Sequence, residues 1–272
     1  MLENVTFGQY YPSRSVVHRM DARVKILLMI LYIVTIFLVN TCSGYIATFL
    51  VLLLTVICAK IPLKTVLKSV KAVLFLILFT TILNILFYKG EYTVSWSWWI
   101  FTVTDGGLIF AGKMAFRLAF LVMGTSLLTF TTTPVELTDG IESLLSPLKL
   151  IKVPVHDIAV IMSITLRFIP ILMEETDKII MAQSSRGADF SSGGIIKKAK
   201  ALLPILIPLF ISAFRRAEEL SNAMDSRCYG APVPRTKHKV MKISFRDIMG
   251  ALVYLGYLAF IIVDNSVLLL LV

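Results

Sequence analysis

One stretch of the chain has the spacing of a nucleotide-binding loop but lacks a residue that such a loop needs. Gly107, Gly112 and Lys113 match the glycines and the lysine of a G-x-x-x-x-G-K-[S/T] loop, which holds the phosphates of a nucleotide. The next residue is Met114, so the hydroxyl group that would bind the magnesium ion is missing. The residues between the two glycines are apolar and belong to a long hydrophobic run. We therefore expect this chain to bind no nucleotide, metal or other cofactor.

Histidines and acidic residues give no pattern typical of an enzyme or an ion-driven pump. His18, His156 and His238 show no H-E-x-x-H or similar spacing. Ionisable residues at bilayer depth are costly and usually serve a function, and here only Lys113 and Arg117 lie inside a hydrophobic run away from its first residues. We expect no catalytic residue and no enzyme activity. A multi-span membrane enzyme or a self-contained secondary transporter is the alternative, although a secondary transporter normally shows inverted repeats or broken midplane helices.

A repeated motif closes two helical stretches. The sequence A-x-x-S-R occurs twice, 41 residues apart, and its copies end in Ser185, Arg186 and Gly187 and in Ser226, Arg227 and Cys228. One arginine in a last helical turn can simply complement the free carbonyl groups and the negative end of the helix dipole, which contributes about 0.3 to 1 kcal/mol. Two arginines in matching contexts also suggest equivalent docking residues for two similar partners. Guanidinium is the usual choice for a buried bidentate pair with a carboxylate.

Small residues recur along one face of a hydrophobic run. They are spaced four apart and are Gly107, Ala111, Ala115 and Ala119. Such a ridge allows two helices to approach closely in lipid. The ridge serves either internal packing of this chain or docking of another membrane protein.

Composition places the chain in a membrane. Hydrophobic residues make up 57% of its 272 residues and charged residues only 16%, and the mean hydropathy is +0.83. Soluble proteins have about 45 to 50% apolar and about 25% charged residues. Five stretches approach the length of a transmembrane helix, namely residues 24–39, 46–59, 70–88, 107–130 and 248–263. The predicted fold class is an all-α polytopic membrane protein with about five transmembrane helices and a cytoplasmic helical domain.

The net charge of +10 indicates orientation rather than a nucleic-acid partner. Four basic residues lie before or at the start of the first predicted span, none lies in the connection 40–45, and four lie in or next to the connection that follows the second span. Short cytoplasmic loops carry the excess of Lys and Arg. We therefore expect a cytoplasmic amino terminus. The connection after the third span gathers Tyr92, Trp96, Trp98 and Trp99, as an interfacial aromatic belt would.

The region between the fourth and fifth spans is both apolar and charged. It opens with Thr133, Pro134 and Glu136, which form a capping box with proline at the first helical position. Residues 155–173 and 201–214 are apolar enough for a seven-span alternative, but that topology would export a cluster of basic residues. We expect helices that lie along or just under the membrane. The predicted domains are residues 1–132, 133–247 and 248–272: a four-span membrane domain, a cytoplasmic domain and a last transmembrane helix.

These motifs resemble a known family, the transmembrane T component of energy-coupling factor (ECF) transporters, a branch of the ABC transporters for vitamins and other micronutrients. The resemblance covers nearly the whole chain. The segment GQYYPSRSVVHRMDARVKILL is similar to the family's entry to the first helix, usually Asp-Pro-Arg-x-Lys, with Ala22 at the proline position. The segments TPVELTDGIESLLSPLKLIKVP, LRFIPILMEETDKIIMAQSSRGADF and RRAEELSNAMDSRCYG resemble the family's coupling domain.

The resemblance implies a function and partners. Two Ala-Arg-Gly-type motifs would each fit a groove on one of two ABC-type ATPase subunits, and here they correspond to Ser185-Arg186-Gly187 and Ser226-Arg227-Cys228. Both copies keep the arginine but lack the alanine, and the second has Cys in place of Gly. A separate membrane-embedded S component would capture the vitamin, and ATP and magnesium would be bound by the ATPases. The family implies a multi-pass protein of a bacterial or archaeal cytoplasmic membrane, surrounded by the lipid bilayer.

Overall fold

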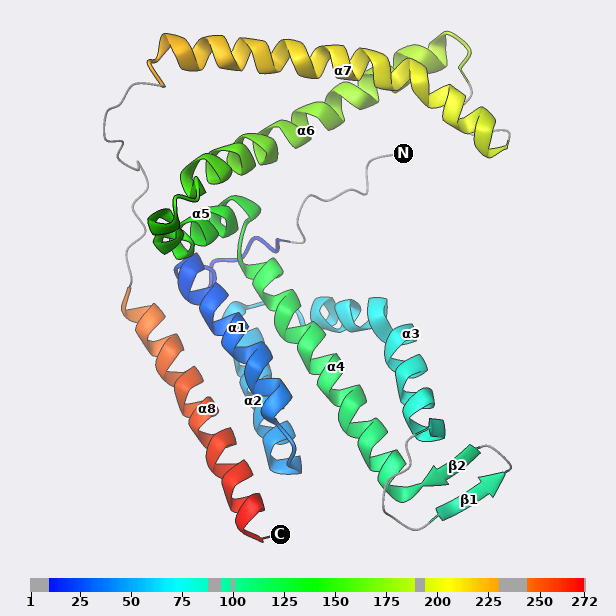
Figure 1. Cartoon of the computed structure of the whole chain (residues 1–272), viewed down its shortest axis with the longest axis vertical. Helices are drawn as coiled ribbons and strands as arrows, with labels where there is room; N and C mark the ends of the chain where they lie inside the picture. The colour runs from blue at the N-terminus through cyan, green and yellow to red at the C-terminus, as the bar shows by residue number, and fades with distance from the viewer. Residues whose placement is uncertain (1–9, 88–93, 99–100, 189–193, 230–243, 272) are drawn as a thin grey trace. The chain divides into compact units, whose positions relative to one another are not determined.

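The protein is a helical molecule in this computed structural model (Figure 1). The structure describes residues 10–87, 94–98, 101–188, 194–229 and 244–271. The chain divides into two compact units, one of Gly8–Val153 with Met241–Val272 and one of Met1–Phe7 with Pro154–Val240. The predicted division at residues 132 and 247 stays a prediction.

The first unit contains most of the helices. They are α1 (Ala22–Leu38), α2 (Cys42–Ala59), α3 (Leu63–Phe87), α4 (Asp105–Thr131), α5 (Pro134–Leu144), the 3-10 helix η1 (Ser146–Ile151) and α8 (Phe245–Leu271). Between α3 and α4, the strands β1 (Val94–Trp98) and β2 (Phe101–Thr104) form an antiparallel hairpin in which Trp98 pairs with Phe101. The all-α polytopic fold class is confirmed, and the hairpin is an addition that the sequence analysis did not predict. Trp96 and Trp98 lie in β1, whereas Tyr92 and Trp99 lie outside the described residues.

Polar side chains begin several of these helices. The hydroxyl of Thr133 accepts a hydrogen bond from the Glu136 N–H at 3.3 Å, with Pro134 at the first helical position, so the predicted helix start is confirmed. Thr41 caps α2 in the same way, accepting from the Gly44 N–H at 3.2 Å. These caps satisfy backbone donors that a helix start leaves without a partner.

Five helices among the described residues are long and apolar enough to cross a membrane, which agrees with a multi-pass protein. They are α2, α3, α4, α8 from Phe245 to Val267, and α6 (Val155–Ser185). Helix α1 has 17 residues, which is at the lower limit for a span. The set therefore includes α6, for which the sequence analysis expected a position along the membrane. That position, and the span assigned to α1, stay predictions.

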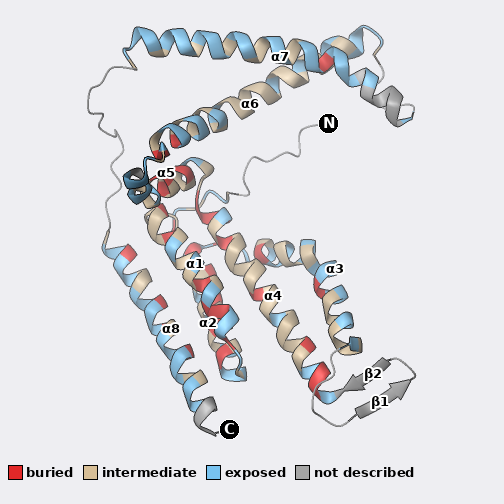
Figure 2. Ribbon diagram, in the orientation of Figure 1, coloured by how far each residue is buried: buried red, intermediate tan, exposed pale blue. Residues whose placement is uncertain are grey.

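The core of the first unit lies among α1, α2, α4 and α8 (Figure 2). Ile36 of α1, Val56 of α2 and Ile261 of α8 are almost fully buried there. Gly124 of α4 allows an especially close approach, because a Cβ atom at this position would overlap the ring of Tyr32. By contrast, α3 contacts α4 and exposes large apolar side chains on its other faces. Such faces suit lipid surroundings.

The second unit consists of α6 and α7 (Ile195–Ser226), which pack against each other. Figure 1 shows that the two helices cross while running in opposite chain directions, so their carboxyl ends lie on opposite sides of the crossing. Pro170 lies inside α6, and Pro204 and Pro208 lie inside α7. Helix α7 exposes an apolar face that includes Ile207 and Phe210.

Candidate functional site

The first copy of the repeated motif forms the end of α6. The Ser185 hydroxyl donates a hydrogen bond to the Met181 carbonyl at 3.0 Å. The Gly187 N–H donates to the Ser184 carbonyl, and the Ala188 N–H donates to the Gln183 carbonyl, both at 3.0 Å. Gly187 has a φ of +87°, the left-handed conformation that glycine adopts easily. This is a Schellman turn, in which the last free carbonyl groups of the helix gain partners.

The second copy forms the same turn at the end of α7. The hydroxyl of Ser226 donates to the Asn222 carbonyl at 2.6 Å. The Cys228 N–H donates to the Asp225 carbonyl at 2.9 Å, and the Tyr229 N–H donates to the Met224 carbonyl at 3.0 Å. Cys228 has a φ of 54°, so it occupies the left-handed position that Gly187 holds in the first copy. A non-glycine residue costs roughly 1 to 2 kcal/mol there, and the turn forms nevertheless.

Both motif arginines are solvent-exposed. Arg186 and Arg227 are exposed, and neither side chain makes a hydrogen bond or ion pair with a described residue. The Schellman turns already supply partners for the last carbonyl groups of each helix. The guanidinium groups are therefore free for an external partner, which favours the docking interpretation over simple capping of the helix ends.

The two motif arginines are separated by equal numbers of residues from an ion pair that joins the helices. The Arg216 guanidinium on α7 lies 3.4 Å from the Glu175 carboxylate on α6. Glu175 precedes Arg186 by eleven residues, and Arg216 precedes Arg227 by the same number. At 1.5 Å per residue, the helix segment between each arginine and its ion-pair residue is about 16 Å long. The two motifs therefore have the same spacing, counted in residues, from the ion pair that joins their helices.

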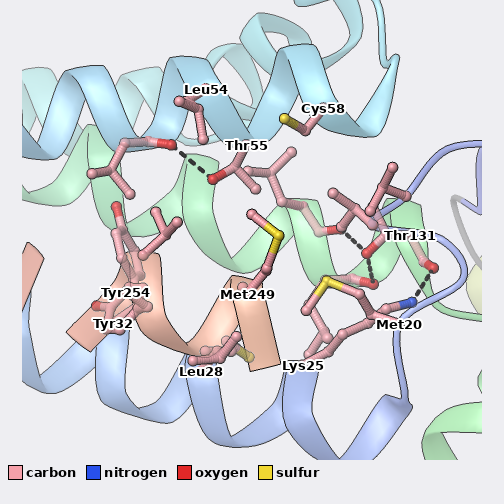
Figure 3. Close-up of a pocket in the computed structure, with 18 of the residues that line it drawn as sticks. Met20, Lys25, Leu28, Tyr32, Leu54, Thr55, Cys58, Thr131, Met249 and Tyr254 are labelled. Atoms are coloured by element: carbon pink, nitrogen blue, oxygen red, sulfur yellow. Dashed lines mark hydrogen bonds between the residues drawn. The ribbon is translucent and has the colours of Figure 1, made fainter. Parts of the chain in front are cut away.

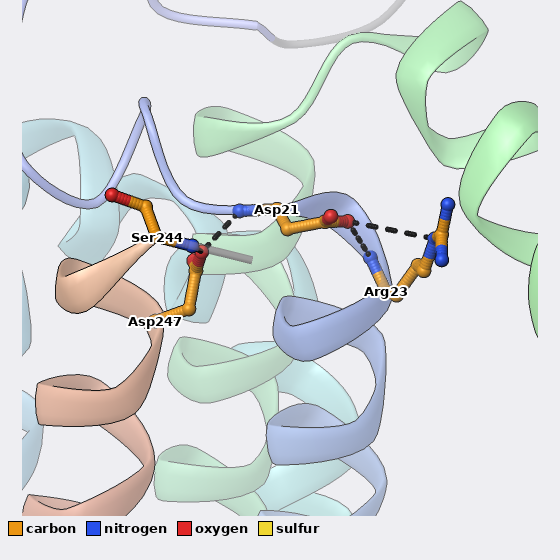
Figure 4. A network of polar contacts seen from close by, with 4 residues as sticks. All are labelled: Asp21, Arg23, Ser244 and Asp247. Carbon is orange, nitrogen blue, oxygen red and sulfur yellow. Dashed lines mark hydrogen bonds and ion pairs between the residues drawn. The ribbon is translucent and has the colours of Figure 1, made fainter. Parts of the chain in front are cut away.

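A polar junction connects the starts of α1 and α8 (Figure 4). The Asp21 carboxylate accepts from the Arg23 N–H at 3.0 Å and caps α1. The buried Asp247 carboxylate accepts from the Asp21 N–H at 2.8 Å and from the Ser244 N–H at 2.6 Å. The role of Asp247 was not predicted from the sequence, although the Ser244-x-x-Asp247 spacing is that of a capping box. This junction explains what the Asp-x-Arg segment does at the entry to the first helix.

Lys25 extends this junction to α4. Its buried ammonium group donates to the Thr131 carbonyl at 2.9 Å and to the His18 carbonyl at 3.2 Å. Thr131 is the last residue of α4, where a cation complements the helix dipole. The entry segment therefore holds one end of α1, α4 and α8 together.

The small-residue ridge lies partly inside the chain. Gly107 and Ala111 are buried, and Ala115 and Ala119 are half-buried along α4. Internal packing accounts for the first two positions. The hypothesis that a second membrane protein docks on the ridge stays a prediction and is carried by the half-buried positions.

The two cations of α4 bind the end of α1. The Lys113 ammonium donates to the Asn40 carbonyl at 2.9 Å, and the Arg117 guanidinium donates to the Val39 carbonyl at 2.7 Å. Their role is structural, because cations complement free carbonyl groups at a helix end. No group of three or more His, Cys, Asp or Glu side chains that could hold a metal ion occurs among the described residues.

Comparisons with known proteins identify the family. Residues 13–238 match the model of the CbiQ family, described as cobalt transport protein. The energy-coupling factor transporter transmembrane protein EcfT of Ruminiclostridium cellulolyticum is 52% identical over 249 residues, which cover 92% of each chain. EcfT of Clostridium kluyveri is 49% identical over 252 residues, 93% of each chain, and EcfT of Bacillus subtilis is 42% identical over 262 residues, 96% of this chain and 98% of its own. This chain therefore belongs to the CbiQ family and, within it, to the EcfT transmembrane proteins of energy-coupling factor transporters.

Proposed function

We propose that this chain is the non-catalytic coupling subunit of an ECF-type ABC transporter for a vitamin or another micronutrient. Two cytoplasmic ATPase subunits bind ATP and magnesium, and a membrane-embedded S component binds the substrate. The chain lies in the cytoplasmic membrane with its amino terminus in the cytoplasm, and the region 133–247 faces the ATPases.

The observation that carries this proposal is the matched pair of helix ends on α6 and α7. Each end has the same Schellman turn, the same serine bond and an exposed arginine separated by the same number of residues from the Glu175–Arg216 ion pair. Two equivalent ends suit two equivalent partners. When the ATPase subunits close around ATP, two docked ends move together, and the helices carry that motion toward the membrane.

The small-residue ridge is the proposed contact for the S component. Gly107, Ala111, Ala115 and Ala119 lie on one face of α4, and small residues let a second helix approach closely. The acidic residues of the apolar helices in the first unit do not support an ion-driven alternative. Asp105 and Asp247 lie in first turns, and Asp264 lies about two turns before the end of α8, where it accepts bonds from Thr41 and Ser43.

Substitution of the two arginines tests the coupling role. If each guanidinium pairs with a buried carboxylate of an ATPase, Arg186→Ala or Arg227→Ala removes half of a desolvated pair, an effect of about 2 to 5 kcal/mol. At about 1.4 kcal/mol per factor of ten, each variant loses at least tenfold in affinity at that contact. The measurement is co-purification of the ATPases in mild detergent together with substrate uptake.

The matched control is Arg215→Ala, which removes an exposed arginine of α7 outside the motif. The double variant Arg186→Ala with Arg227→Ala should no longer bind the ATPases or support uptake. Its amount in the membrane and its binding to the S component should stay unchanged. Lysine should rescue poorly at either position, because a point charge does not reproduce a bidentate fork. Retention of both ATPases by the double variant would contradict the proposal.

A further inference from the structure

A cavity of about 340 Å³ lies among the helices of the first unit (Figure 3). Its walls come from α1, α2, α4 and α8 and from the segment before α1. Leu28, Leu54, Met20 and Met249 give it apolar walls. Its volume is within the range of about 300 to 1,000 Å³ that small-molecule sites occupy. Apolar cavities stay dry and accept apolar ligands.

The cavity begins at one common end of the four helices. Lys25 lies in the first turn of α1, Thr131 is the last residue of α4, and Cys58 is next to the last residue of α2. The basic residues of the short connections place this end on the cytoplasmic side. Tyr32 is seven residues beyond Lys25, and Tyr254 is nine residues into α8, so the cavity reaches about 10 to 14 Å inward. One leaflet of a core about 30 Å thick is about 15 Å deep.

The mouth of the cavity is cationic. Arg246 lines it, is exposed and forms no ion pair with a described residue. The buried Lys25 ammonium also lines it and donates to two carbonyl groups, but the nearby carboxylates of Asp21, Glu136 and Asp247 offset its charge, so the positive charge available to a headgroup is that of Arg246. The neighbouring Asp247 carboxylate is occupied by two backbone N–H groups. The site therefore combines an apolar cavity that is about as deep as one leaflet with positive charge at the level of the lipid headgroups.

We propose that this cavity holds one acyl chain of an anionic phospholipid from the cytoplasmic leaflet. The lipid's acyl chain lies between Leu28, Leu54 and Met249 and points toward Tyr254. The phosphate group of the same lipid pairs with Arg246. Basic pockets between transmembrane helices on the cytoplasmic side bind anionic headgroups. This inference rests on the proposed membrane orientation but not on the proposed coupling to ATPases.

A variant that fills the cavity tests the acyl-chain site. Gly250 lines the cavity, and a Cβ atom there would meet only the flexible end of the Met20 side chain, at 2.6 Å from its Cε. Gly250→Leu should therefore fill the slot without breaking α8. The control is Gly256→Leu on the same helix, where a Cβ atom meets nothing within 4 Å. The whole chain is exchanged into vesicles of equal phosphatidylglycerol and phosphatidylcholine, extracted gently, and its retained lipids are counted by native mass spectrometry.

The expected result is one retained phosphatidylglycerol per chain in the unchanged protein and in Gly256→Leu, and none in Gly250→Leu. Equal retention by the two glycine variants would overturn the proposal. Arg246→Gln should lower the preference for phosphatidylglycerol over phosphatidylcholine about fivefold, the equivalent of about 1 kcal/mol for one cation at the membrane surface. Lys64→Gln removes an exposed cation of α3 outside the cavity and should leave the preference unchanged. If Arg246→Gln behaves like Lys64→Gln, the headgroup assignment is wrong.

Discussion

If the chain couples ATP hydrolysis to uptake as proposed, reversing one charge of the ion pair between α6 and α7 should uncouple the two without unfolding the unit. Glu175 and Arg216 are each about one-third exposed, with relative exposures of 28% and 36%, and their charged atoms lie 3.4 Å apart. Exposed ion pairs contribute about 0.2 to 1 kcal/mol. Glu175→Arg replaces this attraction with a repulsion of similar size, so the free energy of unfolding should change little.

The same charge reversal should displace the carboxyl ends of α6 and α7 by a large distance, although it changes the free energy of unfolding little. About 16 Å of helix separates each motif arginine from its ion-pair residue, so a rotation of about 10° about the ion pair would move Arg186 or Arg227 by about 3 Å. A functional contact must be held within about 0.5 Å. Glu175→Arg or Arg216→Glu should therefore misplace the two arginines relative to their partners while leaving both arginines in place.

The assay compares substrate uptake with ATP hydrolysis for the complex in proteoliposomes. Each single reversal should lower uptake per ATP, and the double variant Glu175→Arg with Arg216→Glu should restore it by re-forming the pair in the opposite sense. Glu218→Arg reverses an exposed charge of α7 that has no ion pair among the described residues, and it serves as the control. If Glu175→Arg behaves like Glu218→Arg, or if the swap restores nothing, the crossing does not set the position of the ends.

Three further changes test other parts of the structure. Gly124→Ala should lower the free energy of unfolding by about 1 to 3 kcal/mol in thermal denaturation, because the added methyl group overlaps a tyrosine ring, whereas Gly112→Ala has open space and should not. Asp247→Ala removes a charged acceptor from two backbone N–H groups and should cost about 1.5 to 3 kcal/mol per bond, measured in the same way, and an unchanged midpoint would contradict the junction. Impermeant thiol reagents on intact cells should label Cys42 but not Cys228, both of which are exposed, and labelling of Cys228 would overturn the predicted orientation.

Features that depend on neighbouring residues were predictable from the sequence. The start of α5 at Thr133 and the ends of α6 and α7 follow from side chains and backbone groups within five residues of each other. Caps of this kind act locally, so a short motif suffices to locate them. The hydrophobic runs similarly located the apolar helices of the first unit, since length and composition decide which helices can span a membrane.

Features that depend on which helices meet were not predictable in this way. The bond from the Asp21 N–H to Asp247 joins residues 226 positions apart, and the bond from Lys25 to the Thr131 carbonyl joins residues 106 apart. The ion pair at the crossing likewise needs α6 and α7 to pack in one register. The hairpin was missed because the aromatic residues of β1 also fit an interfacial belt. Single-sequence patterns carry no information about such partners.

The junction between Asp21 and Asp247 also has a consequence for the order in which the protein is made. During synthesis α1 emerges early, yet the backbone N–H of Asp21 finds its partner only when α8, the last helix, has been translated and inserted. Residues 154–240, which form most of the other unit, are synthesised between these two events. The bundle therefore closes last, and a chain that stops before α8 leaves the α1–α8 junction open.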